Sequence, residues 1–212
     1  MVEILTKQHI NQVITIHMQA FPKSQSTKFG RDFLKCYYEG AVNSTNAISF
    51  IWKEDGIIAG FIFGATNKQE FSRQIMIYSS SSLLKVVILN VLSNPVNSIK
   101  RFWSYLVHYI IPGGDSYYAK DTATLDSVAI LEGYRGRGIS DELIKSFLEK
   151  LKESGIKACR LGVMAENMPA RRFYERNGFE QFNEEGTIYL YFFDDKYRAS
   201  YKTHTVTLEN EK

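Results

Sequence analysis

The chain has 212 residues, of which 44% are hydrophobic and 23% charged, and this composition favours one globular domain with a substantial core. Its formal net charge of +3 is too small for the clustered basic surface expected of a nucleic-acid-binding domain. The two cysteines and four histidines are too scattered for a disulfide framework or a metal site, so we expect Cys36 and Cys159 to be buried and no metal to be bound.

The N-terminal part is expected to form a strand, two helices and a hairpin. Alternation predicts a strand over residues 2–6, and apolar periodicity predicts helices over 7–21, closed by Pro22, and over 27–43. Two apolar runs around "EDG" predict a hairpin over 47–66. No basic segment followed by an apolar one opens the chain, so no signal peptide is indicated and we expect a cytoplasmic protein.

Residues 67–121 differ from the rest and contain one or two helical runs broken at "SNP". We expect a helical insert packed on the core. A lid over a substrate pocket and a dimer surface are alternatives. The apolar run 83–92 is too short to span a bilayer, so no stable membrane insertion is expected. Contact with a membrane surface is a further alternative, because basic and aromatic residues lie together at Lys85, Lys100, Arg101, Phe102 and Trp103.

Strands and helices alternate regularly after residue 121. Periodicity predicts strands over residues 122–131, 157–164 and 187–193, and helices over 139–155 and 169–178. The polar segment 194–212 is expected to fray or to lie along the surface.

The turn "EGYRGRGISDEL" joins the first of these strands to the first helix. Gly136 and Gly138 can take positive φ and let a ligand approach the backbone. The helix N-terminus presents unpaired N–H groups, and Arg135, Arg137 and Ser140 add charge and a hydroxyl, so the turn is typical of a phosphate site. An arginine-rich solvated loop is the alternative. The spacing matches neither a Walker loop nor a dinucleotide-binding fingerprint.

This turn and the stretch "RLGVMAENMPARRFYERNGFE" at 160–180 together resemble the Gcn5-related N-acetyltransferase (GNAT) superfamily. In that family, the pattern Gln/Arg-x-x-Gly-x-Gly/Ala follows the fourth strand and binds the pyrophosphate of acetyl-CoA. The matching residues here are Arg135, Gly136, Arg137, Gly138, Ile139 and Ser140, with Ser140 in place of Gly or Ala. A second family motif is matched by Asn167, Phe173, Tyr174, Gly178 and Phe179.

The resemblance implies an α/β fold in a single domain over residues 1–212. Its sheet would be mixed, mostly antiparallel and seven-stranded, flanked by helices and splayed between the fourth and fifth strands, with the insert between the third and fourth. It also implies an acyltransferase that uses acetyl-CoA as co-substrate and moves the acetyl group to a primary amine by direct attack on the thioester.

The resemblance also assigns roles to individual residues. The backbone of Val128, Ala129 and Ile130 would align the thioester and stabilise its oxyanion. Tyr174 would be the general acid that protonates the departing thiolate, and would contact the cofactor together with Asn167 and Phe173. Ordinary structural roles are the alternatives, namely helix capping for Asn167 and packing for the two aromatic rings.

The general base is less clearly indicated. Many relatives that acetylate protein N-termini carry a Glu where this chain has Gly162. Asp126 on the fourth strand is the candidate base, Glu132 and Glu166 are further candidates, and a water relay is the alternative. We therefore expect a small-molecule acceptor such as a nucleotide-linked amino sugar. Protein or peptide amines, a non-catalytic acetyl-CoA-binding module and a longer acyl donor are alternatives, and a homodimer is left open.

Overall fold

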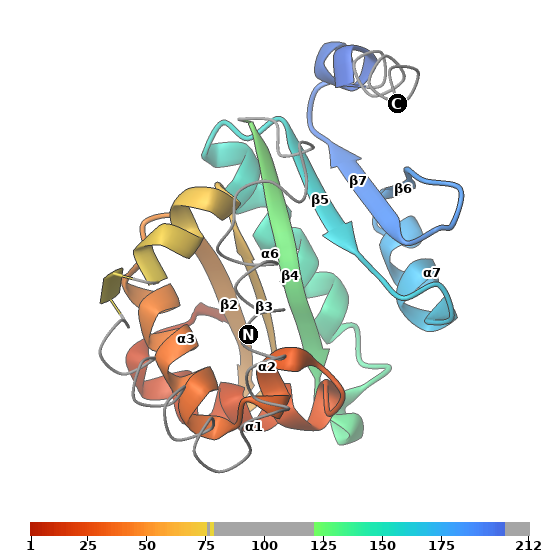
Figure 1. Ribbon diagram of the computed structural model, residues 1–212. Helices are drawn as coiled ribbons and strands as arrows, with labels where there is room; N and C mark the ends of the chain where they lie inside the picture. Colours follow the sequence, from red (N-terminus) through yellow and green to blue (C-terminus); the bar gives the residue numbers. More distant parts are fainter. Residues whose placement is uncertain (76, 79–120, 202–212) are drawn as a thin grey trace, which may run out of the picture.

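The computed structural model describes residues 1–75, 77–78 and 121–201. Seven strands form one sheet in the order β1-β2-β3-β4-β5-β7-β6 (Figure 1). Their bounds are β1 Val2–Ile4, β2 Ala47–Glu54, β3 Ile57–Ala65, β4 Thr122–Ile130, β5 Ala158–Gly162, β6 Glu180–Gln181 and β7 Ile188–Phe192. Among the described strands, only the β4–β5 pair is parallel, so the predicted mixed and mostly antiparallel sheet is confirmed.

Helices cover both faces of this sheet. The α-helices are α1 Ile10–Ala20, α2 Gln25–Lys28, α3 Arg31–Asn43, α6 Ile139–Glu153 and α7 Met168–Arg176, and short 3₁₀ turns lie at η1 Lys7–His9 and η2 Glu132–Tyr134. Residues 68–75 and 195–201 are also helical. Helices α1 and α3 lie on one face and α6 on the other (Figure 1).

The two faces bury two apolar clusters. The first packs α1 and α3 on the sheet through fully buried side chains that include Ile14, Leu34 and Tyr38. The second packs the apolar stripe of α6 on the other face and includes Phe147. Both cysteines are buried, as predicted, and Cys159 is fully buried in the second cluster.

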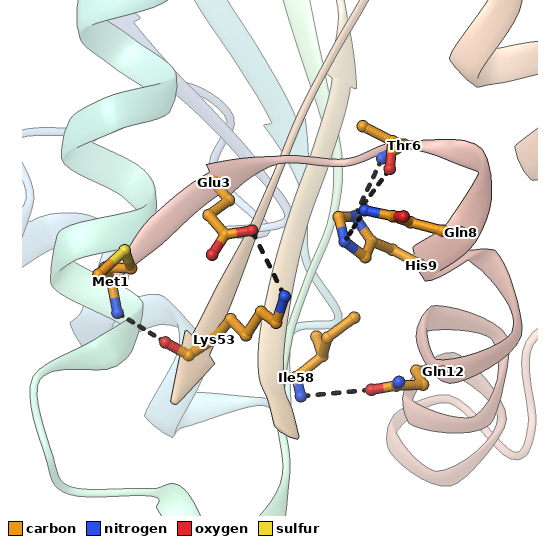
Figure 2. A network of polar contacts seen from close by, with 8 residues as sticks. All are labelled: Met1, Glu3, Thr6, Gln8, His9, Gln12, Lys53 and Ile58. Carbon is orange, nitrogen blue, oxygen red and sulfur yellow. Dashed lines mark hydrogen bonds and ion pairs between the residues drawn. The ribbon is translucent and has the colours of Figure 1, made fainter. Parts of the chain in front are cut away.

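The start of the chain is fastened to the β2–β3 hairpin by polar contacts (Figure 2). The Met1 nitrogen donates to the backbone oxygen of Lys53 at 2.7 Å, and the Lys53 ammonium lies 3.8 Å from the Glu3 carboxylate. The Gln12 side-chain oxygen accepts a hydrogen bond from the Ile58 N–H at 3.3 Å. These contacts hold β1 at the edge of the sheet and α1 over its face.

Three features differ from the sequence-based expectations. The helix predicted over 27–43 is divided at Gly30, whose φ of 91° interrupts the helical backbone and starts α3. Strand β6 was not predicted, because two residues carry no periodicity. Part of the expected polar tail is a helix, because Asp194 accepts hydrogen bonds from the N–H groups of Lys196 and Tyr197 and so caps its first turn.

The first part of the predicted insert packs on the core. Within the helix over residues 68–75, Phe71 and Ile75 are buried among the residues of the α1–α3 cluster. Lys85, Lys100, Arg101, Phe102 and Trp103, on which the membrane-surface alternative rested, lie outside the described residues. Within the described residues, no helix has the length and apolar character needed to cross a membrane.

Candidate active site

Strands β4 and β5 pair over only part of their lengths. Their register runs from Thr122 opposite Ala158 to Leu125 opposite Leu161 and then stops, although β4 continues to Ile130. The two strands diverge toward their C-terminal ends (Figure 1). Backbone groups of a strand point alternately to its two neighbours, so those of 126–130 that point toward β5 have no strand partner there.

A β-bulge marks the point where the pairing stops. On the other side of β4, Ser127 lies opposite Phe63 and Leu125 lies opposite Gly64, which leaves Asp126 as the extra residue. Asp126 as a whole is exposed, while its side chain is only 19% exposed. The exposure therefore belongs mainly to the backbone, which is open to a ligand at this point.

The turn after β4 has the open backbone that a phosphate site needs. Gly136 and Gly138 have φ values of 75° and 78°, and a Cβ atom at either would meet nothing within 4 Å. Gly138 is the N-cap of α6 and supplies no side-chain cap, so the N–H groups of Ile139 and Ser140 are left without an intrahelical partner. The loop therefore fits an anion such as the pyrophosphate of acetyl-CoA.

The two arginines of this loop differ in their surroundings. The Arg137 guanidinium contacts both carboxylate oxygens of Glu54 at 2.8 and 3.0 Å, and lies 5.1 Å from the ring centroid of Tyr134. Arg135 is exposed. Both guanidinium groups are exposed and can face an incoming phosphate, and Arg137 also fastens the loop to the end of β2.

The first turn of α6 carries two acidic residues, and both are engaged by donors. The Trp52 indole N–H donates to the Glu142 carboxylate at 2.8 Å. Arg176 and Asn177, at the end of α7, each donate to Asp141 at 3.0 Å, and these hydrogen bonds lower the pKa of Asp141 against the effect of burial. These donors offset the negative charge of Asp141 and Glu142 beside the loop. The contacts to Asp141 also join the end of α7 to the start of α6.

Helix α7 carries the second predicted motif. The Asn167 side-chain oxygen accepts a hydrogen bond from the N–H of Ala170 at 3.3 Å, so its capping role is confirmed. Phe173 is half-buried and packs edge-on against Tyr174, with ring centroids 5.1 Å apart. Contacts of Asn167 and Phe173 with acetyl-CoA remain predictions.

Tyr174 packs among three other aromatic rings. Its ring contacts those of Phe173, Phe179 and Tyr189, and within residues 1–75 and 121–201 its hydroxyl has no hydrogen-bond partner. Burial, with a smaller contribution from the nearby Cys159 thiol, raises the pKa of Tyr174 to about 12. The phenol therefore keeps its proton at neutral pH, as a general acid must.

Cys159 lies near both candidate catalytic groups. Burial and the charge of Asp126 raise the pKa of this thiol, and the thiol in turn contributes to the raised pKa of Tyr174. The Cys159 thiol therefore interacts electrostatically with groups on both β4 and α7.

Lys68 is a residue of this site that sequence reasoning missed. Its ammonium forms an ion pair with Asp126 and lies 5.6 Å from the ring centroid of Phe71. Lys68 stands 58 residues before Asp126 in the chain, and a single lysine at the start of a helical run gives no signal of such a contact.

The other residues considered for the base lie in loop regions. Glu132 is in the exposed η2 turn and Glu166 is exposed in the loop before α7. At Gly162, a Cβ atom would meet only the Thr187 backbone oxygen, at 3.9 Å, so the end of β5 is open.

A pocket of about 570 Å³ lies away from these groups, along α6 and the end of β7. Its lining residues are Asp141, Lys145, Leu148, Glu149, Lys152, Asn177, Tyr191, Phe192 and Phe193, and it contains none of the predicted site residues. Among the described residues, no cluster of histidine, cysteine and acidic side chains is arranged to hold a metal ion.

The chain resembles known acetyltransferases in sequence and in fold. A curated relative, the mycothiol acetyltransferase of Corynebacterium aurimucosum, is 38% identical over 66 residues, which are 30% of this chain and 22% of the relative. The match therefore spans less than a quarter of that relative's length.

Two solved structures share the fold. The aminoglycoside N-acetyltransferase AAC(6')-Iy in complex with CoA has a TM-score of 0.58 at 15% identity, over 87% of this chain and 90% of that one. The ribosomal-protein-S18-alanine N-acetyltransferase of Escherichia coli has a TM-score of 0.52 at 16% identity, over 90% and 92%. The sequence model of the acetyltransferase (GNAT) family matches residues 10–179 of this chain. With most of its length matched, and with the sheet and both motifs in place, the chain belongs to the GNAT family of acetyltransferases.

Proposed function

We propose that the protein is an acetyl-CoA-dependent N-acetyltransferase that acts on a small primary amine. The observation that carries this proposal is the course of β4, which runs on beyond its pairing with β5 directly into the open loop at the start of α6. A co-substrate with a pyrophosphate at one end and a thioester at the other fits this path. Its phosphates would lie on the loop with Arg135, and its pantetheine arm along the unpaired edge of β4.

In this arrangement, the backbone of Val128, Ala129 and Ile130 holds the thioester carbonyl and stabilises the oxyanion that develops on it. Asp126, in the bulge beside them, accepts a proton from the acceptor ammonium, and the amine attacks the carbonyl carbon. The carbon–sulfur bond then breaks, and Tyr174 gives its proton to the departing thiolate. Tyr174 is reprotonated by the second proton that the acceptor nitrogen loses, and Asp126 releases the first proton to solvent. CoA leaves more readily as a thiol than as a thiolate. A phenol that keeps its proton can supply the proton that this requires.

The acceptor we propose is a small molecule such as a nucleotide-linked amino sugar. Gly162 stands where many relatives that acetylate protein N-termini carry a Glu, which favours a different class of acceptor. The similar proteins include a mycothiol acetyltransferase, an aminoglycoside N-acetyltransferase and a ribosomal-protein-S18-alanine N-acetyltransferase. Protein or peptide amines are therefore the second candidate acceptor.

The test is release of CoA from acetyl-CoA across a panel of amines that includes nucleotide-linked amino sugars, free amino sugars, aminoglycosides, polyamines and short peptides. We expect saturable turnover with one class of small amine and a product heavier by one acetyl group. Turnover with peptides alone would contradict the small-molecule acceptor. Binding of acetyl-CoA without turnover of any amine would indicate a non-catalytic binding module.

A further inference from the structure

The Lys68 side chain brings a primary amine of the protein itself to the candidate base. Its ammonium is paired with the Asp126 carboxylate, and the two side chains are only 13% and 19% exposed. The ring of Phe71 lies beside the same ammonium. A carboxylate and an aromatic ring together form a site for a cation, which is also what the ammonium of an acceptor requires.

The helix that carries Lys68 holds it at this place. Phe71 and Ile75, on the following turns, are buried in the α1–α3 cluster, so the start of the helix is fixed over the sheet. Asp126 is fixed by its place in the bulge of β4. The contact therefore joins two anchored elements.

A general base must lie within hydrogen-bonding reach of the proton that it removes. In the proposed reaction, Asp126 takes this proton from the acceptor nitrogen, and the Lys68 nitrogen already lies within hydrogen-bonding reach of Asp126. A tethered amine at that place needs no binding step and reacts with a high effective concentration.

We propose that the protein acetylates its own Lys68, an inference that rests on the proposed function. Asp126 takes one proton from the ammonium and passes it to solvent. The Lys68 nitrogen then forms a bond to the carbonyl carbon of acetyl-CoA, and the carbon–sulfur bond breaks. Tyr174 gives its proton to the CoA thiolate. The Lys68 nitrogen then loses its second proton, which reprotonates Tyr174. The products are acetylated Lys68, CoA and one released proton.

Acetylation changes the site in two ways. It removes the positive charge that pairs with Asp126, and it leaves a bulky amide in the place of the acceptor. The modified protein should therefore turn over its external amine more slowly than the unmodified protein.

The experiment incubates the purified full chain with acetyl-CoA and no added amine, and follows acetylation of each lysine by peptide mass spectrometry. Lys150 is the matched control, because it is also ion-paired, to Glu153 at 2.9 Å, and its side chain is 52% exposed on α6. We expect Lys68 to be acetylated at least about tenfold faster than Lys150 although it is less exposed, because the reaction is intramolecular. The rate at Lys68 should not change when the protein is diluted.

Replacement of the base, Asp126→Asn, should slow acetylation of Lys68 and leave the slow chemical acetylation of Lys150 unchanged. Preincubation with acetyl-CoA should lower amine turnover by the natural protein but not by Lys68→Arg, which keeps the cation and cannot be acetylated in this way. If Lys68 reacts no faster than Lys150 while an external amine is turned over, this proposal is overturned and the proposed function stands. If neither Lys68 nor any external amine is acetylated while acetyl-CoA binds, the proposed function fails as well.

Discussion

Tyr174 and Asp126 come from different elements, α7 and β4. Their surroundings fit opposite tasks. The phenol is packed among rings and keeps its proton, whereas the carboxylate is ion-paired with the Lys68 ammonium. One group can therefore give a proton while the other accepts one, as aminolysis of a thioester requires.

Tyr174→Phe should lower kcat by about 10²–10⁴-fold, because it removes the proton donor and leaves the ring packing in place. Steady-state kinetics with the accepted amine measure this loss. The matched control is Tyr191→Phe, which removes a hydroxyl from another half-buried tyrosine of the same cluster and should leave kcat within about threefold of the natural value. Equal effects of the two changes would contradict the acid role.

The pH dependence of kcat is a second test of Tyr174 as the general acid. A general acid must be protonated, so activity should fall only as pH rises through the pKa of Tyr174, which is about 12. We expect kcat to rise with pH as the acceptor amine loses its proton, and to show no fall up to pH 10. A fall with a midpoint near pH 8 or 9 would show that another group is the acid.

At the scale of elements, the loop and the start of α6 act as one unit. Gly138 has left-handed φ, caps the helix without a side chain and leaves its backbone open to a ligand. Arg137 fastens this unit to β2 through Glu54, and Asp141 joins it to α7. A loop held at both ends presents its N–H groups in one geometry, which lowers the entropy cost of binding an anion.

Gly138→Ala should raise KM for acetyl-CoA at least about tenfold, because the new methyl group lies where the phosphates approach the backbone. The matched control is Gly155→Ala at the other end of α6, where φ is 74° and a Cβ atom also meets nothing within 4 Å. Both changes should cost a similar 1–2 kcal/mol or so of stability from the left-handed backbone. Similar KM values for the two variants would contradict a phosphate site at the loop.

At the scale of the whole molecule, a buried polar chain joins the three N-terminal helices. His17 on α1 lies 2.9 Å from the Tyr38 hydroxyl of α3 and 3.0 Å from the Ser26 hydroxyl of α2. Burial lowers the pKa of His17 from 6.5 to about 4, so the folded protein keeps this ring neutral where the unfolded chain would protonate it. Stability should therefore fall as pH drops.

The sign and size of this effect follow from linkage. The contribution of His17 is fully present above pH 6.5 and is lost as pH falls from 6.5 to about 4. Because one pKa unit corresponds to 1.36 kcal/mol, the loss is about 3 kcal/mol. The free energy of unfolding can be measured with urea at pH 7 and at pH 4. Between these two pH values it should fall by about 3 kcal/mol more for the natural protein than for the His17→Gln variant. A stability difference between the two proteins that is the same at both pH values would contradict this account.

The sequence allowed the loop, α6 and the hairpin to be predicted because their signals are local. Glycine spacing, an apolar stripe and a turn flanked by apolar runs each act over a few residues. The pairs Lys68–Asp126 and Arg137–Glu54 were not predicted, because they join residues 58 and 83 positions apart and depend on how the sheet is assembled. The division of the second helix at Gly30 depends on φ at one residue, which glycine permits but does not require.

The most direct test of the account is calorimetric titration of the natural protein with acetyl-CoA. The open β4 edge and the loop before α6 predict one saturable site per chain, with a Kd between about 1 μM and 1 mM and competition by free CoA. The Gly138→Ala variant should bind more weakly and the Gly155→Ala variant should bind as the natural protein does. An absence of binding at millimolar acetyl-CoA would contradict the site, the proposed function and the acetylation of Lys68 together.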